Sequence, residues 1–355
     1  MRSHYDLIIV GAGPAGCRAA ELACQLKPKW AVLLIECRTE IDWERYHNIC
    51  TGGISVKAMN ELRPDAVKHI DQKLTKVEER WPSDIAVESE IEGYVVDRRA
   101  IMKDQTESFR DAGGEVLEDT VVDVRNSHDS CRILTKGNRL LTSHYLLGAD
   151  GVNSIVRKRI FKSETETVVP VTQYHSMTGG KPGTLVLEYG AQYKGRYRGT
   201  FPTRDGHGYI IGFPSGTQRP SDPKVLMPER LIPVGLVSAL VSGNIAIIGD
   251  AAGMANPLTY AGLRNSWTAA RMVIKAMADG DLQRFEREWR ESPLADPTFL
   301  DAHRLIKASD DKALIELASI FRYGPNMSSL IIGIIKTPGF PIFYRAHVRK
   351  MSFGW

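Results

Sequence analysis

Three glycines near the N-terminus have the spacing needed to hold a phosphate group. In YDLIIVGAGPAGCRAAELACQL, Gly11, Gly13 and Gly16 lie between a strand-like and a helix-like segment. The first permits a tight turn, the second lets the backbone approach a pyrophosphate, and the third packs helix on strand. Free N–H groups and the positive dipole end of the helix then favour the phosphates. The motif predicts a dinucleotide ligand, with Ala15 also among its contacts.

A carboxylate stands where the ribose of such a ligand would lie. The apolar strand AVLLIE ends in Glu36, 20 residues after Gly16. An acid at this distance can accept a hydrogen bond from a ribose hydroxyl. We expect its neighbour Cys37 beside the same ligand. A chance Gly-rich turn is the less favoured alternative, because the strand, the helix and the acid occur together, but this fingerprint does not distinguish NAD from FAD.

Two later motifs distinguish between these cofactors. DGVNSIVR places Asp150 in DGxxSxxR spacing, and GDAAG supplies Gly249 and Asp250 after the apolar run NIAIIGD. GxGxxG, DG and GD in this order resemble the flavoprotein superfamily typified by p-hydroxybenzoate hydroxylase. The resemblance implies an FAD whose ribityl chain is held by Asp250 and along which Arg98 lies. For each later motif taken alone, a Gly-Asp turn that merely ends a strand is the alternative.

The residues after Asp250 suit a flavin ring. Ala251, Ala252 and Gly253 are small, so a flavin could lie against their backbone. A helix that begins near Gly262 and Leu263 would direct its N-terminus at the pyrimidine edge of the ring. Reduced flavin carries negative charge at that edge, and a helix dipole stabilises an anion there.

Three longer stretches resemble the geranylgeranyl reductase family of FAD-dependent oxidoreductases. They are GDAAGMANPLTYAG, NICTGGIS and YRGTFPTRDGHG. Gly253 stands where hydroxylases of the superfamily more often have His, and Gly199 where the reductase family has Trp. The resemblance implies a reductase that saturates carbon–carbon double bonds of a prenyl chain. It also implies that the substrate lies near Phe201 and Pro202.

An isolated alkene accepts hydride poorly, because no carbonyl withdraws the resulting negative charge. Its reduction needs a proton from a positioned acid, and by the resemblance Cys50 is the candidate, with Tyr197 as the second. The alternative for Cys50 is a small packed thiol, and for Tyr197 and Phe201 it is a place in the core. The remaining thiols are expected in the core: Cys17, Cys24, Cys37 and Cys131. His175 and His207 are weaker candidates for proton transfer.

The electron donor and the reaction class have alternatives. The chain has no second GxGxxG motif, so electrons come from transiently bound NAD(P)H or from a protein such as ferredoxin. A flavin-dependent monooxygenase or halogenase that acts on a small aromatic is the second hypothesis. A flavin-bearing binding or electron-relay protein is the third.

These motifs predict an α/β fold in which a Rossmann-like FAD-binding domain is interrupted by an antiparallel β-sheet substrate domain and followed by a C-terminal helical segment. The stretch TQRPSDPKVLMPERLIP reads as a proline-rich connection. The expected FAD-binding domain comprises residues 1–75, 96–160 and 240–290; the substrate domain comprises 76–95 and 161–239; the helical segment comprises 291–355.

Composition excludes several other classes of protein. The net charge of +4 and pI near 8.7 are too mild to indicate nucleic-acid binding. Five cysteines without CxxC spacing, and no apolar run near 18 residues, favour a cytoplasmic protein with neither a metal site nor a membrane span. The tail mixes apolar residues with bases that could rest on an anionic lipid surface, or form the edge of a packed helix: Lys336, Arg345, Arg349 and Lys350.

Overall fold

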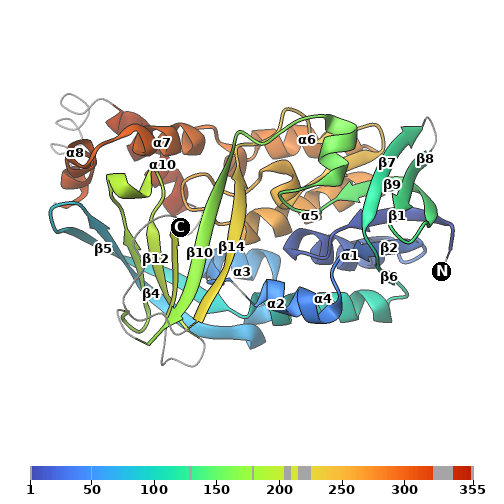
Figure 1. Ribbon diagram of the computed structural model, residues 1–355, viewed down its shortest axis with the longest axis horizontal. Helices are drawn as coiled ribbons and strands as arrows, with labels where there is room; N and C mark the ends of the chain where they lie inside the picture. The colour runs from blue at the N-terminus through green and yellow to red at the C-terminus, as the bar shows by residue number, and fades with distance from the viewer. Residues whose placement is uncertain are drawn as a thin grey trace.

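A computed structural model describes residues 2–48, 50–127, 130–177, 180–203, 209–214, 225–322 and 339–352. Within these residues the chain forms two mixed sheets of eight strands each. Figure 1 shows the sheet that contains the N-terminal strand on the right and the other sheet on the left, with helices between and above them. The predicted α/β class, with both parallel and antiparallel pairing, is confirmed at this level.

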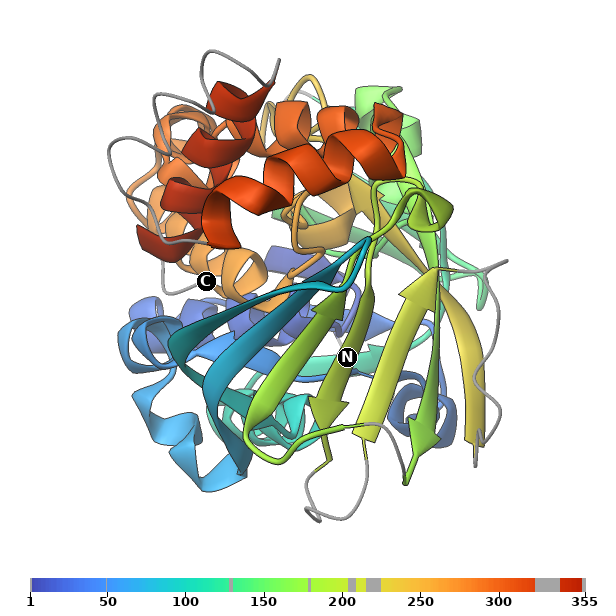
Figure 2. The same cartoon turned by 90° about the vertical axis from the view of Figure 1, so that its left-hand side faces the viewer.

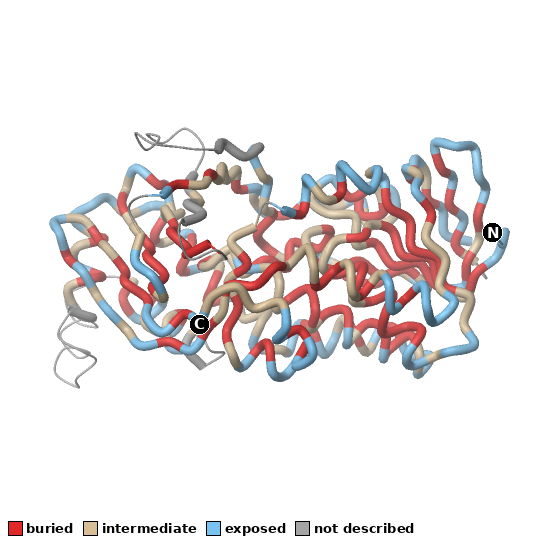
Figure 3. Tube along the Cα trace, turned by 90° about the horizontal axis from the view of Figure 1, so that it is seen from below, coloured by how far each residue is buried: buried red, intermediate tan, exposed pale blue. Residues whose placement is uncertain are grey.

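The first sheet has the strand order β15-β16-β9-β1-β2-β6, and the β7–β8 hairpin joins it through β9. Its strands are β1 (His4–Val10), β2 (Val32–Glu36), β6 (Glu115–Glu118), β7 (Val121–Ser127), β8 (Ser130–Thr135), β9 (Leu140–Gly148), β15 (Val241–Ser242) and β16 (Ile245–Ile247). From β6 to β16 the pairing is parallel. Such strands are buried on both faces, which explains their continuous apolar runs and the buried strands near the N-terminus in Figure 3.

Helices cover the first sheet and share its core with the strands. The longer ones are α1 (Pro14–Leu26), α4 (Arg98–Asp111), α5 (Leu263–Ala278) and α6 (Leu282–Glu291), and α1 packs against both α4 and α5. Shorter helices and helical turns connect the two sheets or follow their strands: α2 (Glu40–His47), α3 (Val56–Leu62), η1 (Pro64–His69), η2 (Arg157–Phe161), η3 (Ala191–Tyr193), η4 (Gly249–Ala252) and η5 (Pro293–Ala295).

The second sheet has the strand order β14-β10-β13-β12-β11-β4-β5-β3. Its strands are β3 (Gly53–Ser55), β4 (Ile70–Trp81), β5 (Ile85–Val96), β10 (Thr167–Ser176), β11 (Thr184–Glu188), β12 (Arg198–Pro202), β13 (Tyr209–Pro214) and β14 (Val225–Val234). Its pairing is antiparallel except between β11 and β4. The sheet is thus built from two separate parts of the chain, residues 53–96 and 167–234.

Two sequence expectations about strands are wrong. Part of the proline-rich connection is the ten-residue strand β14, which pairs with β10. β14 is an edge strand, where proline is tolerated because one side needs no ladder hydrogen bond, and Pro228 falls at the register shift in that pairing. The alternating residues of EVLEDTVVDVR and CRILTK also predict antiparallel strands, but β6 pairs in parallel with β2.

The C-terminal region is mainly helical over its described residues, as predicted. α7 (Thr298–Ala308), α8 (Asp311–Arg322) and α10 (Phe340–Ser352) lie over the second sheet, as Figure 2 shows. They share an apolar cluster with Trp81 and Ile85 of β4 and β5. Among the described helices, none combines the length and the apolar character needed to cross a bilayer.

Candidate cofactor site

Four strands of the first sheet end side by side, and each ends at a predicted motif. Val10 of β1 is aligned with Ile35 of β2 and with Gly148 of β9, which is in turn aligned with Ile247 of β16. The next residues along these strands are therefore the GxGxxG turn, Glu36, the DG motif and the GD motif. Ligands of open α/β sheets bind outside the carboxyl ends of the strands, so this edge is the candidate site.

The three glycines of the first motif differ in what surrounds them. A Cβ on Gly11, whose φ is +100°, would lie 2.4 Å from the carbonyl oxygen of Ala149, and one on Gly16 would lie 1.8 Å from that of Gly11. These two positions pack backbone against backbone. A Cβ on Gly13 would meet no atom within 4 Å. The open space therefore lies at the middle glycine, where α1 begins and no side chain caps its N-terminus.

Glu36 joins the end of β2 to the glycine turn. It is buried, and one carboxylate oxygen accepts a hydrogen bond from the Ala12 N–H at 2.8 Å. The other accepts from the Arg38 backbone N–H at 3.0 Å and from its guanidinium at 3.1 Å. The oxygen bonded to Ala12 has a second lone pair, so it could still accept a hydrogen bond from a hydroxyl. Cys37 is exposed, so its expected place in the core is wrong, whereas Cys17, Cys24 and Cys131 are buried.

Asp250 lies on η4, directly beyond β16. Among the described residues, none donates a hydrogen bond to its carboxylate. Burial raises its pKa to about 6, against the opposing effect of the Arg98 guanidinium. A Cβ on Gly262 would lie 3.8 Å from Asp250 Oδ1, which places the uncapped N-terminus of α5, at Gly262 and Leu263, beside this carboxylate.

Asp150 organises the turn that follows β9. Its Oδ2 accepts hydrogen bonds from the backbone N–H groups of Ile155 at 2.7 Å and Val156 at 3.3 Å. Its Oδ1 is buried and finds no partner in the described part of the chain, and burial raises the pKa of the carboxyl. The buried Arg157 donates to the carbonyl oxygen of Ala251 at 3.0 Å. The arginine of the DGxxSxxR motif therefore ties the DG turn to the GD turn.

The Cys50 loop reaches the same region from the second sheet. The Gly52 N–H donates to Cys50 Sγ at 3.3 Å, and the Gly52 carbonyl accepts from the Val96 N–H at 3.0 Å. Gly52 has a φ of +68°, and a Cβ there would lie 2.3 Å from the Val96 carbonyl oxygen. Because Val96 is followed by Asp97 and Arg98, this docking brings the Cys50 loop beside the start of α4.

Tyr197 approaches different groups. Its hydroxyl donates to the Thr259 carbonyl oxygen at 2.5 Å, its ring stacks on Tyr260 with centroids 5.6 Å apart, and burial raises its pKa. Phe201 is buried in an apolar cluster of the second sheet. A Cβ on Gly199 would lie 3.1 Å from both the Tyr197 and Phe201 rings. The two aromatic rings thus occupy the space that a larger residue 199 would need.

The structure describes only part of the rest of the stretch YRGTFPTRDGHG. Pro202 ends β12 and is aligned with Tyr209 of β13. Gly206, His207 and Gly208 lie outside the described residues. His175 lies on β10, and its Nε2 is buried without a hydrogen-bond partner among the residues that the structure describes.

Two features of the site are not predicted by its motifs. Tyr260 has a φ of +56°, rare for a bulky residue, and its loop is fixed by Asn256, whose Oδ1 accepts from two backbone N–H groups. The run Asn-Pro-Leu-Thr is a turn signal that could have indicated this loop. The other feature is Arg230, which lies near Cys50, Arg98 and Tyr46. Arg230 lies in the stretch TQRPSDPKVLMPERLIP, and no sequence motif there marks it as a site residue.

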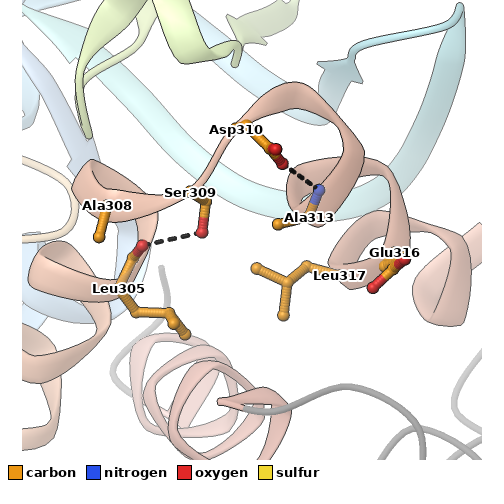
Figure 4. Close-up of a pocket in the computed structure, with 7 residues that line it drawn as sticks. All are labelled: Leu305, Ala308, Ser309, Asp310, Ala313, Glu316 and Leu317. Atoms are coloured by element: carbon orange, nitrogen blue, oxygen red, sulfur yellow. Dashed lines mark hydrogen bonds between the residues drawn. The ribbon is translucent and has the colours of Figure 1, made fainter.

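A cavity of about 390 Å³ lies elsewhere, where α7 turns into α8 (Figure 4). Its lining contains none of the predicted site residues. Ser309 and Asp310 use their side chains locally, the first donating to the Leu305 carbonyl and the second accepting from the Ala313 N–H, each at 2.8 Å. We therefore place the candidate site at the sheet edge and not in this cavity.

The residues at the sheet edge fit a flavin dinucleotide. The open space at Gly13 and two uncapped helix N-termini suit anionic groups. Asp250 offers an acceptor that no described donor uses, as a polyhydroxyl chain would require. No cluster of potential metal ligands occurs among the described residues.

Comparisons with known proteins agree with this geometry. Residues 6–169 match the family model described as lycopene cyclase protein. A digeranylgeranylglycerophospholipid reductase of Methanopyrus kandleri is 25% identical, with 81% of this chain and 86% of that protein covered. The reductase of the same name from Methanoculleus marisnigri is 24% identical, with 95% of each chain covered.

Solved structures share the fold across the whole chain. A geranylgeranyl bacteriochlorophyll reductase-like protein of Thermoplasma acidophilum has a TM-score of 0.75 at 16% identity, with 98% of this chain and 99% of that chain covered. A p-nitrophenol 4-monooxygenase of Pseudomonas putida has a TM-score of 0.74 at 12% identity, with 100% and 99% covered. The fold alone therefore does not separate reductases from monooxygenases. The relatives matched by sequence are named as reductases, and they confirm the resemblance of this chain to the geranylgeranyl reductase family of FAD-dependent oxidoreductases.

Proposed function

We propose that the chain is an FAD-dependent reductase that saturates carbon–carbon double bonds of a prenyl chain. The observation that carries the proposal is the meeting of the Cys50 loop with Arg98 and Asp250 at the carboxyl edge of the first sheet. A thiol, a cation and a free carboxylate acceptor thus converge where a flavin would lie. The relatives named as reductases cover most of the chain at 24–26% identity, which supports the same reading.

In this proposal the first sheet and its helices hold FAD. The N-terminus of α1 would receive the pyrophosphate at Gly13, and Glu36 would accept a ribose hydroxyl. Asp250 would accept ribityl hydroxyls, with Arg98 along the same chain. We retain the expected division into residues 1–75, 96–160 and 240–290 for FAD and 76–95 and 161–239 for the substrate as part of the proposal. Two strands of the second sheet, β3 and the first half of β4, fall within residues 1–75.

The chain's own residues would supply the proton and the shape of the site. When bound and reduced, FAD supplies the hydride. Cys50 Sγ accepts one hydrogen bond from the Gly52 N–H, and its own proton is available for an alkene carbon. Tyr197 is the weaker acid candidate, because its proton is engaged by the Thr259 carbonyl. Both sheets would enclose an apolar chain and exclude water from the reacting carbons.

The source of electrons and the route of the lipid complete the proposal. Either NAD(P)H or a ferredoxin-type protein could reduce the flavin. α10 exposes Ile342 and Val348 together with Arg345, a combination suited to contact with an anionic membrane surface. Arg349 and Lys350 are instead engaged by Asp296 and Glu79, at 3.2 and 3.3 Å, and Lys336 lies outside the described residues. Co-sedimentation with anionic vesicles at low salt tests the contact.

The reaction can be tested on the purified protein. FAD-loaded enzyme, reduced chemically under anaerobic conditions, is incubated with geranylgeranyl phosphate, and the product is analysed by mass spectrometry. Gain of hydrogen in pairs, with flavin reoxidation, supports the reductase. The alternative is a monooxygenase, because the p-nitrophenol 4-monooxygenase has a similar fold. A monooxygenase predicts no reaction under anaerobic conditions. It predicts an oxygenated product from a small aromatic in air.

A further inference from the structure

Three arginines from separate elements gather around one short segment of the site. Arg38 and Arg230 lie over the ring of Tyr46, with guanidinium carbons 3.7 and 3.3 Å from its centroid. Both guanidinium groups are therefore close to one another. Arg98 lies next to them, with Nη2 3.4 Å from His47 Nδ1. We call Arg38, Arg98 and Arg230 the arginine cluster.

The arginine cluster is short of negative charge. Burial lowers the pKa of Arg230, and the guanidinium groups of Arg98 and Arg38 lower it further. The pKa of His47 lies well below its usual value because of burial and the same three cations, so His47 adds no charge. Glu36 faces Arg38 and Asp250 faces Arg98. No carboxylate of the described residues pairs with Arg230.

Donor atoms of the arginine cluster that have no acceptor also indicate an anionic ligand. The Nε atoms of Arg98 and Arg230 are buried without an acceptor among the described residues. Arg230 otherwise donates to the main-chain carbonyl of Tyr46. Guanidinium groups that lie close together repel one another, and an anion that shares the site offsets this repulsion. The cluster is therefore suited to an anionic ligand with several acceptor oxygens.

Arg230 comes from a different part of the fold than Arg38 and Arg98, which indicates a different role. Arg38 follows Glu36 and Arg98 faces Asp250, so both adjoin the expected FAD path. Arg230 comes from β14 at the edge of the second sheet, and its guanidinium is close enough to Cys50 for the two groups to interact electrostatically. Arg230 thus projects from the proposed substrate side toward the proposed acid.

We propose that Arg230, supported by Arg38 and Arg98, binds the phosphate group of a phosphorylated prenyl substrate. The proposal rests on the proposed function and extends it, because it makes a phosphate headgroup part of what the enzyme recognises. Guanidinium groups bind phosphate oxygens in pairs, and several can share one dianion. The pyrophosphate of FAD is a second source of the same chemistry, and the experiment must distinguish the two.

The test compares two ligands with the same hydrocarbon chain. Binding of geranylgeranyl phosphate and of geranylgeraniol to the oxidised FAD-loaded enzyme is measured by calorimetry, without turnover. The wild type should bind the phosphate at least about tenfold more tightly, because guanidinium groups donate charge-assisted hydrogen bonds to phosphate oxygens. Arg230→Gln should abolish that preference and leave affinity for the alcohol unchanged. Arg230→Lys should keep part of it.

Arg271→Gln, which removes an exposed arginine from α5, is the matched control and should behave as wild type. FAD dissociation constants and melting temperatures are measured for every variant. Equal binding of the two ligands by the wild type, or a weakened FAD affinity of Arg230→Gln with the phosphate preference intact, would overturn the proposal. If neither ligand is reduced in turnover but the preference and its loss are observed, the proposed reaction fails and the phosphate site stands.

Discussion

At the scale of single residues, Asp250 has an unusual electrostatic position. Its carboxylate is half-buried, near Arg98, and without a hydrogen-bond donor among the described residues. Its pKa is raised to about 6, above that of the unfolded chain. Between the two pKa values the folded protein holds a proton that the unfolded chain has lost. Asp250 therefore lowers the stability of the FAD-free protein as the pH rises from about 4 to about 6.

FAD affinity should depend on pH in the opposite direction. Hydroxyl donors favour the charged carboxylate, so FAD should bind more tightly as the pH rises through about 6 and the affinity should then level off. One unit below that pKa, binding should be about tenfold weaker than on the plateau. Fluorescence titrations between about pH 5 and about pH 8 measure this. In Asp250→Asn the slope should vanish, and an unchanged slope would assign the titration to another group.

Cys50 allows a role in proton transfer to be separated from a role in loop geometry. Cys50→Ala should retain FAD binding and flavin reduction, but slow alkene saturation by about 10²-fold, the scale expected when a general acid is lost. Cys50→Ser is the matched variant, because its hydroxyl can still accept the Gly52 N–H bond although it is a far weaker acid. Single-turnover rates should be low in both. Recovery by serine would show that the sulfur serves only the loop.

The motif residues of the site could be predicted from the sequence because each follows a strand and carries its own local signal. Glu36, Asp150 and Asp250 are such residues. Arg230 could not, because its importance depends on where β14 pairs and not on its sequence neighbours. The departure at Gly199 acquires its reason only in three dimensions, where the rings of Tyr197 and Phe201 fill the space beside it.

At the scale of elements, two glycines at the start of α1 have different roles: Gly16 allows close packing, and Gly13 leaves space for a ligand. A Cβ on Gly16 would collide with backbone, whereas a Cβ on Gly13 would enter open space at an allowed φ of −83°. Gly13→Ala should therefore melt close to wild type and bind FAD at least about tenfold more weakly, because its methyl group occupies the proposed phosphate position.

Gly16→Ala should show the reverse order of effects. The methyl group cannot be accommodated without moving the turn, and overpacking of this kind costs typically 1–3 kcal/mol of folding free energy. Its melting temperature should fall with and without FAD. Thermal melts and FAD titrations on the pair check both statements, and a Gly13→Ala protein with wild-type FAD affinity would remove the phosphates from this turn.

Elements whose burial is simple were the easiest to predict. β1 and β2 are buried on both faces and read as apolar runs, and α1 follows its glycine turn. β14 was missed because Pro228 and Pro233 argue against a strand, and only its place at the sheet edge makes them acceptable. β6 was assigned the wrong pairing because strand direction depends on the partner, β2, which lies far away in the sequence.

At the scale of the whole molecule, the two sheets meet at the turn that carries Asp250. Val234, at the end of β14, forms an isolated bridge with Ala255, and the Val237 N–H donates to the Ala252 carbonyl at 3.2 Å. Gly253 lies between these contacts with a φ of +69°, and a Cβ there would lie 2.3 Å from the Gly235 carbonyl oxygen. Gly253, the residue after GDAA, is therefore where the chain that leaves the second sheet contacts the turn that carries Asp250.

Gly253→Ala should consequently disturb both sheets together. It adds backbone strain at positive φ and a collision with Gly235, and the displaced turn carries Asp250, so stability and FAD affinity should fall in parallel. Gly280→Ala is the matched control, because Gly280 has a φ of +75° but no atom within 4 Å of its would-be Cβ. It carries the strain alone, which costs of order 1 kcal/mol, and should bind FAD normally.

The comparison is made by thermal melting and FAD titration of the two variants and the wild type. A melting temperature for Gly253→Ala well below that of Gly280→Ala, with weakened FAD binding only in the former, would locate the coupling between the sheets at this contact. Equal effects would mean that the strain is local and that the sheets are joined elsewhere. Gly253→His, the residue more usual in hydroxylases of the superfamily, should be more disruptive still, because the close approach of Gly235 leaves no room for any side chain at this position.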